Sequence, residues 1–117
     1  MAELRQYHAP SGRSPYAQWF NNLDHLAAAK VVVSLSRLEA GNTSNVKAVG
    51  EGVNELKISF GPGYRVYFGW DGAQVVILLA GGTKKRQDAD IRRARTFWSD
   101  YQQRKAQAHK RAAKSCH

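Results

Sequence analysis

The chain has 117 residues, a formal net charge of +9 and one cysteine, Cys116. This length suits one small domain with a single core. No apolar run reaches the ~18–20 residues that span a membrane, and the first residues lack the hydrophobic stretch of a signal peptide. A lone cysteine excludes an internal disulfide and fits a reducing cytoplasm.

The positive charge is concentrated in the last third of the chain. Residues 1–82 contain 7 Lys/Arg and 6 Asp/Glu, whereas residues 83–117 contain 11 and 3. Such an excess indicates a polyanionic partner, either nucleic acid or an acidic protein segment. Residues 104–117 hold five Lys/Arg and no acid, so we expect a flexible basic tail after a single domain at 1–103. Composition leaves open whether this tail binds a partner or only aids solubility.

The N-terminal segment is predicted to contain a strand and then a helix. Residues 2–8 are a weak strand candidate. Ser14 and Pro15 are typical of a helix start, with the serine as N-cap and the proline at the first helical position. Apolar residues follow at helical spacing and predict a buried stripe: Tyr16, Trp19, Phe20 and Leu23.

A second helix is predicted over residues 25–40, with Asp24 as its N-cap. Gly41 is expected to end it. The segment 41–52 then reads as a loop. The inward face of this helix is expected to carry Ala28, Val31, Val32, Leu35 and Leu38.

Residues 50–91 predict a β-meander that leads into the last helix. If Gly61-Pro62-Gly63 is a three-residue hairpin loop, Lys57 faces Tyr67 and Ser59 faces Arg65. Side chains alternate across a strand, so one face is apolar and packs on the core. We expect the other face to be polar, and its members are Glu55, Lys57, Ser59, Arg65 and Tyr67.

The third strand of the meander, Gln74 to Ala80, is apolar on both faces. We expect Val76 and Leu78 to lie exposed beside Arg65 and Tyr67 and to dock a partner segment. The last helix is predicted from residue 87 to about 103. Its packing stripe is expected to be Ile91, Ala94, Trp98 and Tyr101.

These elements and their motifs resemble one known group of proteins. The segment VKAVGEGVNELKISFGPGYRVYF is followed by LLAGGTKKRQDADI and a helix that bears aromatic residues. Over residues 3–103 this resembles the RelE/ParE toxin superfamily, and within it the HigB-like addiction module killer protein branch. The resemblance implies an α+β, RelE-like fold. Its small antiparallel or mixed sheet, an N-terminal strand plus a three-stranded meander, would pack on an N-terminal helical hairpin, with a C-terminal helix.

The same resemblance implies a function. The chain would be the toxin of a bacterial type II toxin–antitoxin system, in the cytoplasm and without a membrane partner. It would act as a metal-independent, ribosome-associated mRNA endonuclease that uses no cofactor and inhibits translation. A cognate antitoxin, a small helix-turn-helix DNA-binding protein, would neutralise it. Operator DNA would be reached only through the toxin–antitoxin complex.

Five residues are candidate catalytic residues under this resemblance. Arg65 matches the family's Gly-Tyr-Arg arginine, which stabilises the scissile phosphate, and an arginine fork suits two phosphate oxygens. Lys84 or Lys85 matches a second cation after the last strand, and Lys57 resembles a strand cation. Relatives often carry a tyrosine or histidine acid–base group near the last helix. Tyr67 is the candidate substitute, although a reference pKa near 10 makes it a poor base unless cations lower it.

Alternative interpretations remain at this stage. An alternative for Arg65 is a surface strand arginine that pairs with Glu55 on the same face. The chain may be read instead as a non-enzymatic gyrase inhibitor like the ParE branch, which the missing acid–base group favours. A third hypothesis is an inactive toxin that retains only antitoxin binding.

Overall fold

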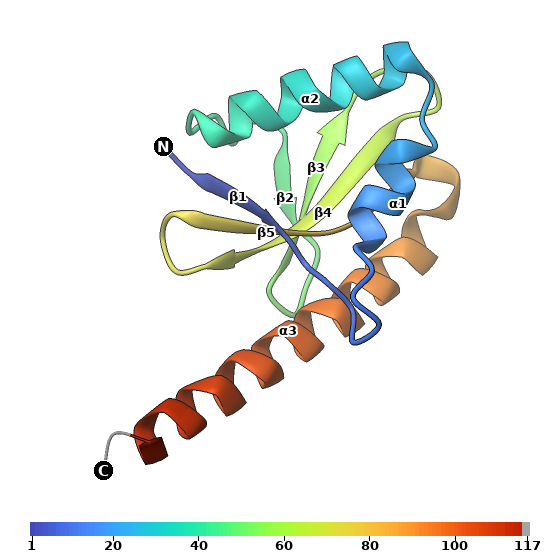
Figure 1. Ribbon diagram of the computed structural model, residues 1–117. Helices are drawn as coiled ribbons and strands as arrows, with labels where there is room; N and C mark the ends of the chain where they lie inside the picture. The colour runs from blue at the N-terminus through green and yellow to red at the C-terminus, as the bar shows by residue number, and fades with distance from the viewer. Residues whose placement is uncertain (116–117) are drawn as a thin grey trace.

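The computed structural model describes residues 1–115 and has a five-stranded sheet at its centre (Figure 1). The strand order is β1-β5-β4-β3-β2, with β1 parallel to β5 and every other pair antiparallel. The strands are β1 (Glu3–Gln6), β2 (Val46–Ala48), β3 (Val53–Ile58), β4 (Tyr64–Asp71) and β5 (Val75–Thr83). The helices are α1 (Pro15–Asn21), α2 (His25–Glu39), the 3-10 turn η1 (Lys84–Arg86) and α3 (Gln87–Ser115). The predicted α+β class is confirmed, and the arrangement is compatible with a small RelE-like fold.

Both predicted N-caps are confirmed. The Ser14 hydroxyl accepts a hydrogen bond from the Ala17 amide at 3.1 Å, and Pro15 is the first residue of α1. The Asp24 carboxylate accepts from the Ala27 amide at 2.8 Å at the start of α2. These side chains satisfy amide groups that have no partner inside the helix, which explains why both helices begin there.

One face of the sheet packs against α1 and α2. The buried residues of α2 are Ala27, Val31, Leu35 and Leu38, and they meet Leu56, Ile58, Val66, Phe68, Val76 and Leu78 of the sheet. The prediction for Val32 was wrong, because this side chain is 50% exposed. Val31 already occupies the inward position, and Val32 lies about 100° further round the helix.

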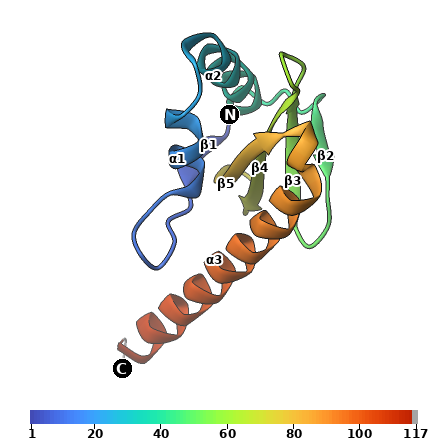
Figure 2. The same ribbon diagram turned by 90° about the vertical axis from the view of Figure 1, so that its right-hand side faces the viewer.

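The opposite face of the sheet is covered by α3, as the side view in Figure 2 shows. Ala94 and Trp98 of α3 pack with buried sheet residues of a second core: Val53, Tyr67, Ile77, Leu79 and Ala80. The face predicted to be open and polar is therefore largely enclosed. The sequence predicts that the last helix comes after the sheet in chain order. It does not predict that this helix packs over the face of the sheet that carries Arg65 and Tyr67.

The predicted exposed strip of Val76 and Leu78 was wrong. Both side chains are buried in the first core, at 0% and 4% exposure. The turn between β4 and β5 sets the register, because Asp71 pairs with Val75, so Trp70 pairs with Val76 and Phe68 with Leu78. Paired residues share a face, so Val76 and Leu78 join Phe68 on the face that α1 and α2 cover. A β-bulge lies beyond these pairs, because Tyr67 pairs with Ala80 and an extra residue is left in β5.

The hairpin register also differs from the prediction. Ile58 pairs with Tyr64 and Lys57 with Arg65, so the connection is five residues long and the register is shifted by two. The turn is closed by a hydrogen bond from the Gly63 amide to the Phe60 carbonyl at 3.0 Å. A shift of two preserves the faces, so Lys57, Arg65 and Tyr67 still share one side.

Two further segments differ from expectation. The predicted loop at 41–52 contains β2, whose residues pair antiparallel with β3. Helix α3 continues to Ser115 instead of ending near residue 103, because Ala, Lys, Arg and Gln in this stretch are good helix formers. Cys116 lies outside the described residues.

Candidate functional site

The sheet register brings three of the predicted site residues to the same end of the sheet. Lys57 lies opposite Arg65, and Arg65 lies opposite Gly82 on the other side. Lys84 follows directly after β5, and its amide donates to the Gly63 carbonyl at 2.9 Å. The cations of β3, β4 and η1 therefore gather around the Gly63 turn.

Gly63 is required at this turn for two reasons. Its φ is +79°, a left-handed conformation that side chains disfavour. A Cβ at this position would also lie 2.8 Å from Nη1 of Arg65. The guanidinium packs against the bare backbone, and Nη1 donates to the Gly63 carbonyl at 2.7 Å.

Arg65 is buried and partnered by Glu55. The arginine is 5% exposed and the glutamate 4%. Nε of Arg65 lies 3.8 Å from Oε1 of Glu55, and Oε2 accepts a hydrogen bond from Nε2 of Gln87 at 2.7 Å. The Arg65–Glu55 pair that the sequence left as an alternative is thus present. The carboxylate fixes the guanidinium at the sheet end while Nη1 reaches the Gly63 turn.

The remaining cations are exposed. Lys57, Lys84 and Lys85 all face solvent. A shallow groove beside η1 is lined by Lys84, Lys85, Arg86, Gln87, Asp88, Ala89 and Arg92. Five of these seven side chains donate hydrogen bonds, four with a positive charge, which suits an anionic ligand.

Tyr67 is fully buried between the sheet and α3. Its hydroxyl has no hydrogen-bond partner among the described residues. Burial raises the pKa of Tyr67 far above its ordinary value, and the charges of Glu55 and Asp90 raise it further, although Arg65 opposes them. Burial therefore favours the protonated phenol, which is poorly suited to act as a general base near neutral pH.

Asp90 is a buried residue in the first turn of α3. It is 4% exposed, and burial raises its pKa, whereas Arg93 with Nη1 at 3.5 Å acts in the opposite direction. A Cβ on Gly82 would overlap the Asp90 carboxylate, and a Cβ on Gly81 would overlap the Trp19 indole. The Gly81-Gly82 pair therefore admits one side chain onto each face of β5. Two adjacent glycines in a strand were the sequence signal that other side chains pack closely against its backbone.

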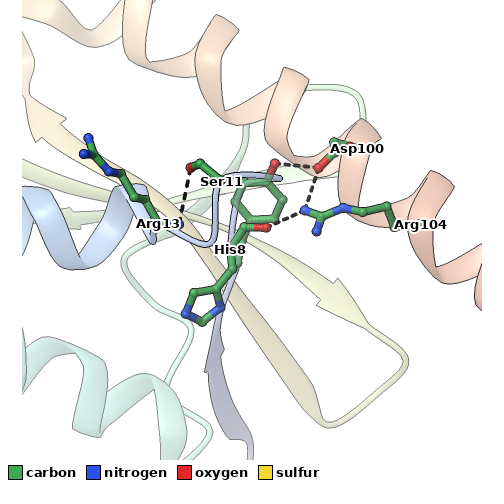
Figure 3. Close-up of polar contacts among 6 residues, drawn as sticks. His8, Ser11, Arg13, Asp100 and Arg104 are labelled. Carbon is green, nitrogen blue, oxygen red and sulfur yellow. Dashed lines mark hydrogen bonds and ion pairs between the residues drawn. The ribbon is translucent and has the colours of Figure 1, made fainter.

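The middle of α3 is tied to the loop after β1, as Figure 3 shows. The Tyr7 hydroxyl donates to Asp100 at 2.6 Å, and Arg104 donates to the same carboxylate at 2.6 Å and to the His8 carbonyl. Tyr7 also stacks on Phe97, with ring centroids 5.2 Å apart. Burial, helped by the hydrogen bond to Asp100, raises the pKa of Tyr7 to about 12.

Residues 18–99 match the family described as Phage derived protein Gp49-like (DUF891). The chain belongs to this Gp49-like family. It is a RelE/addiction-module-killer-like family that is linked to toxin–antitoxin toxins, and it implies an antitoxin partner. The matched region contains Lys57, Arg65, Lys84 and Lys85, and it ends before the second half of α3.

The Gp49-like chain is also similar to an uncharacterized protein of Haemophilus influenzae (strain ATCC 51907 / DSM 11121 / KW20 / Rd). The two are 42% identical over 81 residues, which cover 68% of this chain and 82% of the relative. Among the described residues, no helix has the length and apolar character needed to cross a membrane.

Proposed function

We propose that this Gp49-like protein is the toxin of a type II toxin–antitoxin pair and cleaves mRNA on the ribosome without a metal ion. The observation that carries the proposal is the convergence of Lys57, Arg65 and Lys84 at one end of the sheet. Family membership adds support, because the family is linked to such toxins. The HigB-like branch is part of this proposal.

The proposed reaction uses the RNA itself as nucleophile. The 2′-oxygen forms a bond to the adjacent phosphorus and the bond from phosphorus to the 5′-oxygen breaks. The 2′-hydroxyl gives its proton to water and the 5′-oxygen gains one, which leaves a 2′,3′-cyclic phosphate and a 5′-hydroxyl. Arg65, held by Glu55, would stabilise the charge that develops on the phosphorane, and Lys57 with Lys84 or Lys85 would bind the neighbouring phosphate oxygens.

The test is a reconstituted reaction with purified protein, translating ribosomes and mRNA in the presence of EDTA. We expect cleavage that EDTA does not inhibit, with products that end in 2′,3′-cyclic phosphate. Arg65→Gln should lower the rate roughly 100-fold, as expected for loss of one donor to a developing anion. Arg13→Gln, in the exposed loop before α1, is the matched control and should cut at the wild-type rate. Products with other ends would contradict the 2′-OH mechanism.

The antitoxin surface is proposed on α2, in place of the buried Val76/Leu78 strip. Leu26, Val32 and Val33 are 60%, 50% and 47% exposed on this helix. A groove beside them is lined by Lys30, Val33, Ser34, Arg37, Asn45, Lys57, Ile58, Ser59 and Phe60. Apolar side chains next to three cations fit an acidic amphipathic segment.

The test of this surface is co-expression with the protein encoded beside the gene. Leu26→Asp with Val33→Asp should abolish co-purification and restore growth arrest. Gln18→Asp on the exposed side of α1 should leave the complex intact. Retention of the complex by the α2 double variant would contradict the assignment.

A second candidate function is inhibition of DNA gyrase without catalysis. The observation that favours it is the buried, protonated Tyr67, which leaves the proposed proton carrier unable to accept a proton. Growth arrest with DNA breaks, an SOS response and intact mRNA would select this candidate.

A further inference from the structure

The C-terminal half of α3 projects beyond the sheet (Figures 1 and 2). The molecule is 54 Å along its longest axis and 29 Å along the next. Every residue from 102 to 112 is exposed. Residues 104–115 hold five Lys/Arg and no acid. Arg104 and Lys105 are tied to the domain through His8, Asp100 and Asp71, and the basic helix projects beyond them.

One line along α3 faces away from the sheet. It consists of residues spaced three or four apart, and we call it the outer stripe: Arg92, Thr96, Ser99, Gln103, Gln107 and Lys110. All six are exposed. At 1.5 Å per residue, the stripe is roughly 27 Å long.

The outer stripe is continuous with the cationic end of the sheet. Arg92 lines both the groove beside η1 and a second shallow hollow over the middle of α3. The second hollow also contains Glu51 and Asp100. Glu51 lies 3.5 Å from Arg95, and Asp100 is bound by Tyr7 and Arg104, so neither carboxylate stands without a cation nearby.

The composition of the outer stripe favours nucleic acid over an acidic protein as its binding partner. Every side chain of the stripe is polar and each one donates hydrogen bonds. A protein partner would bury little apolar surface there, whereas a phosphate backbone needs only cations and donors. Arginine, lysine, serine, threonine and glutamine are the side chains that contact phosphates and sugars. Double-stranded RNA is recognised mainly by such backbone and 2′-OH contacts.

We infer that the outer stripe of α3 binds the phosphate backbone of duplex RNA and extends the cationic end of the sheet, with which it shares Arg92. This inference rests on the proposed function in that both assume an RNA partner. The stripe would add sequence-independent affinity and hold the cationic sheet end close to folded RNA. Gln107 and Lys110, which lie in the basic segment that the sequence left open as functional or solubilising, are thereby assigned a role in binding.

The test measures the salt dependence of binding to a 20-base-pair RNA duplex that is 2′-O-methylated on both strands. This probe has no free 2′-hydroxyl, so the result does not depend on whether the protein cuts RNA. The variant is Arg92→Gln with Lys110→Gln in the full chain. The control, Arg5→Gln with Arg13→Gln, removes the same charge from exposed positions of β1 and of the loop before α1.

Loss of two phosphate contacts should reduce the slope of log affinity against log salt by roughly 2, at about 0.9 for each duplex contact. The control pair should keep the wild-type slope. An unchanged slope in the stripe variant would overturn the inference, and so would an equal fall in both variants, which would report net charge alone. Unchanged duplex binding with a loss of binding to a polyglutamate peptide would also overturn it, in favour of an acidic protein partner.

Discussion

At the residue scale, the buried polar side chains beside Arg65 hold it in place at the cationic end of the sheet. Glu55 accepts from Gln87 and lies next to Arg65, so one carboxylate links β3, β4 and α3. The sequence predicted that Glu55 and Arg65 share a face, because alternation along two strands settles it. It did not predict their burial, since burial depends on where α3 packs, which no local pattern specifies.

The close approach of Asp90 to Gly82 gives a test by substitution. Gly82→Ala should destabilise the protein by about 1–3 kcal/mol or more, because the new methyl group overlaps the Asp90 carboxylate. Asp90→Ala makes room for it, so Gly82→Ala should cost much less in that background. Urea denaturation of the four proteins in the cycle measures the coupling. Additive effects would show that the glycine is needed for another reason.

The ionisation of Asp90 should appear in the pH dependence of stability. Its pKa is raised above 3.8 by burial, so its contribution is fully present below that pH and is lost as the pH rises through the raised value. Asp90→Asn should therefore flatten the fall in unfolding free energy as the pH rises above about 4. Asp71 and Asp100 have lowered pKa values and act below this window. A variant with the wild-type slope would contradict the assignment.

At the element scale, local signals predicted the helix starts and non-local packing set the rest. Ser14 and Asp24 act within their own helices, so their caps could be predicted. The bulge between Tyr67 and Phe68 could not be predicted from the sequence, because it depends on the pairing of two strands and on the helices that cover them. Strand β2 is three residues long and partly polar, which leaves no periodicity to detect.

The tie between α3 and the loop after β1 is testable as a unit. The pKa of Asp100 is lowered chiefly by the hydrogen bond from Tyr7 and then by Arg104, so this contact adds stability above about pH 4 that is lost on acidification. Tyr7→Phe should lower the unfolding free energy at pH 7 by about 1–2 kcal/mol and weaken its fall below pH 4. Amide hydrogen exchange of α3 should also become faster. Wild-type exchange in the variant would show that stacking on Phe97 alone holds the helix.

At the scale of the whole molecule, the sheet divides two cores, and the proposed binding surfaces meet at its cationic end, through Lys57 and Arg92. Lys57, Arg65 and Lys84 lie at one end of the sheet, the apolar surface of α2 covers one face, and the outer stripe of α3 lies beyond the other. The charge distribution along the sequence predicted a polyanionic partner. The cationic sheet end and the basic helix both fall within the last two-thirds of the chain, so the charge distribution alone does not distinguish them. The folded arrangement does.

The central claim is that the cations at the end of the sheet position mRNA for cleavage. The most direct measurement is primer extension on mRNA from cells in which the toxin is induced. The wild type should produce discrete cuts, and Lys57→Ala with Lys84→Ala should reduce them at least roughly tenfold, since both lysines are exposed and their loss leaves the cores intact. Arg5→Ala with Arg13→Ala, at exposed positions of β1 and of the loop before α1, should cut like the wild type. Intact mRNA during wild-type growth arrest, or unchanged cutting by the double lysine variant, would contradict the claim.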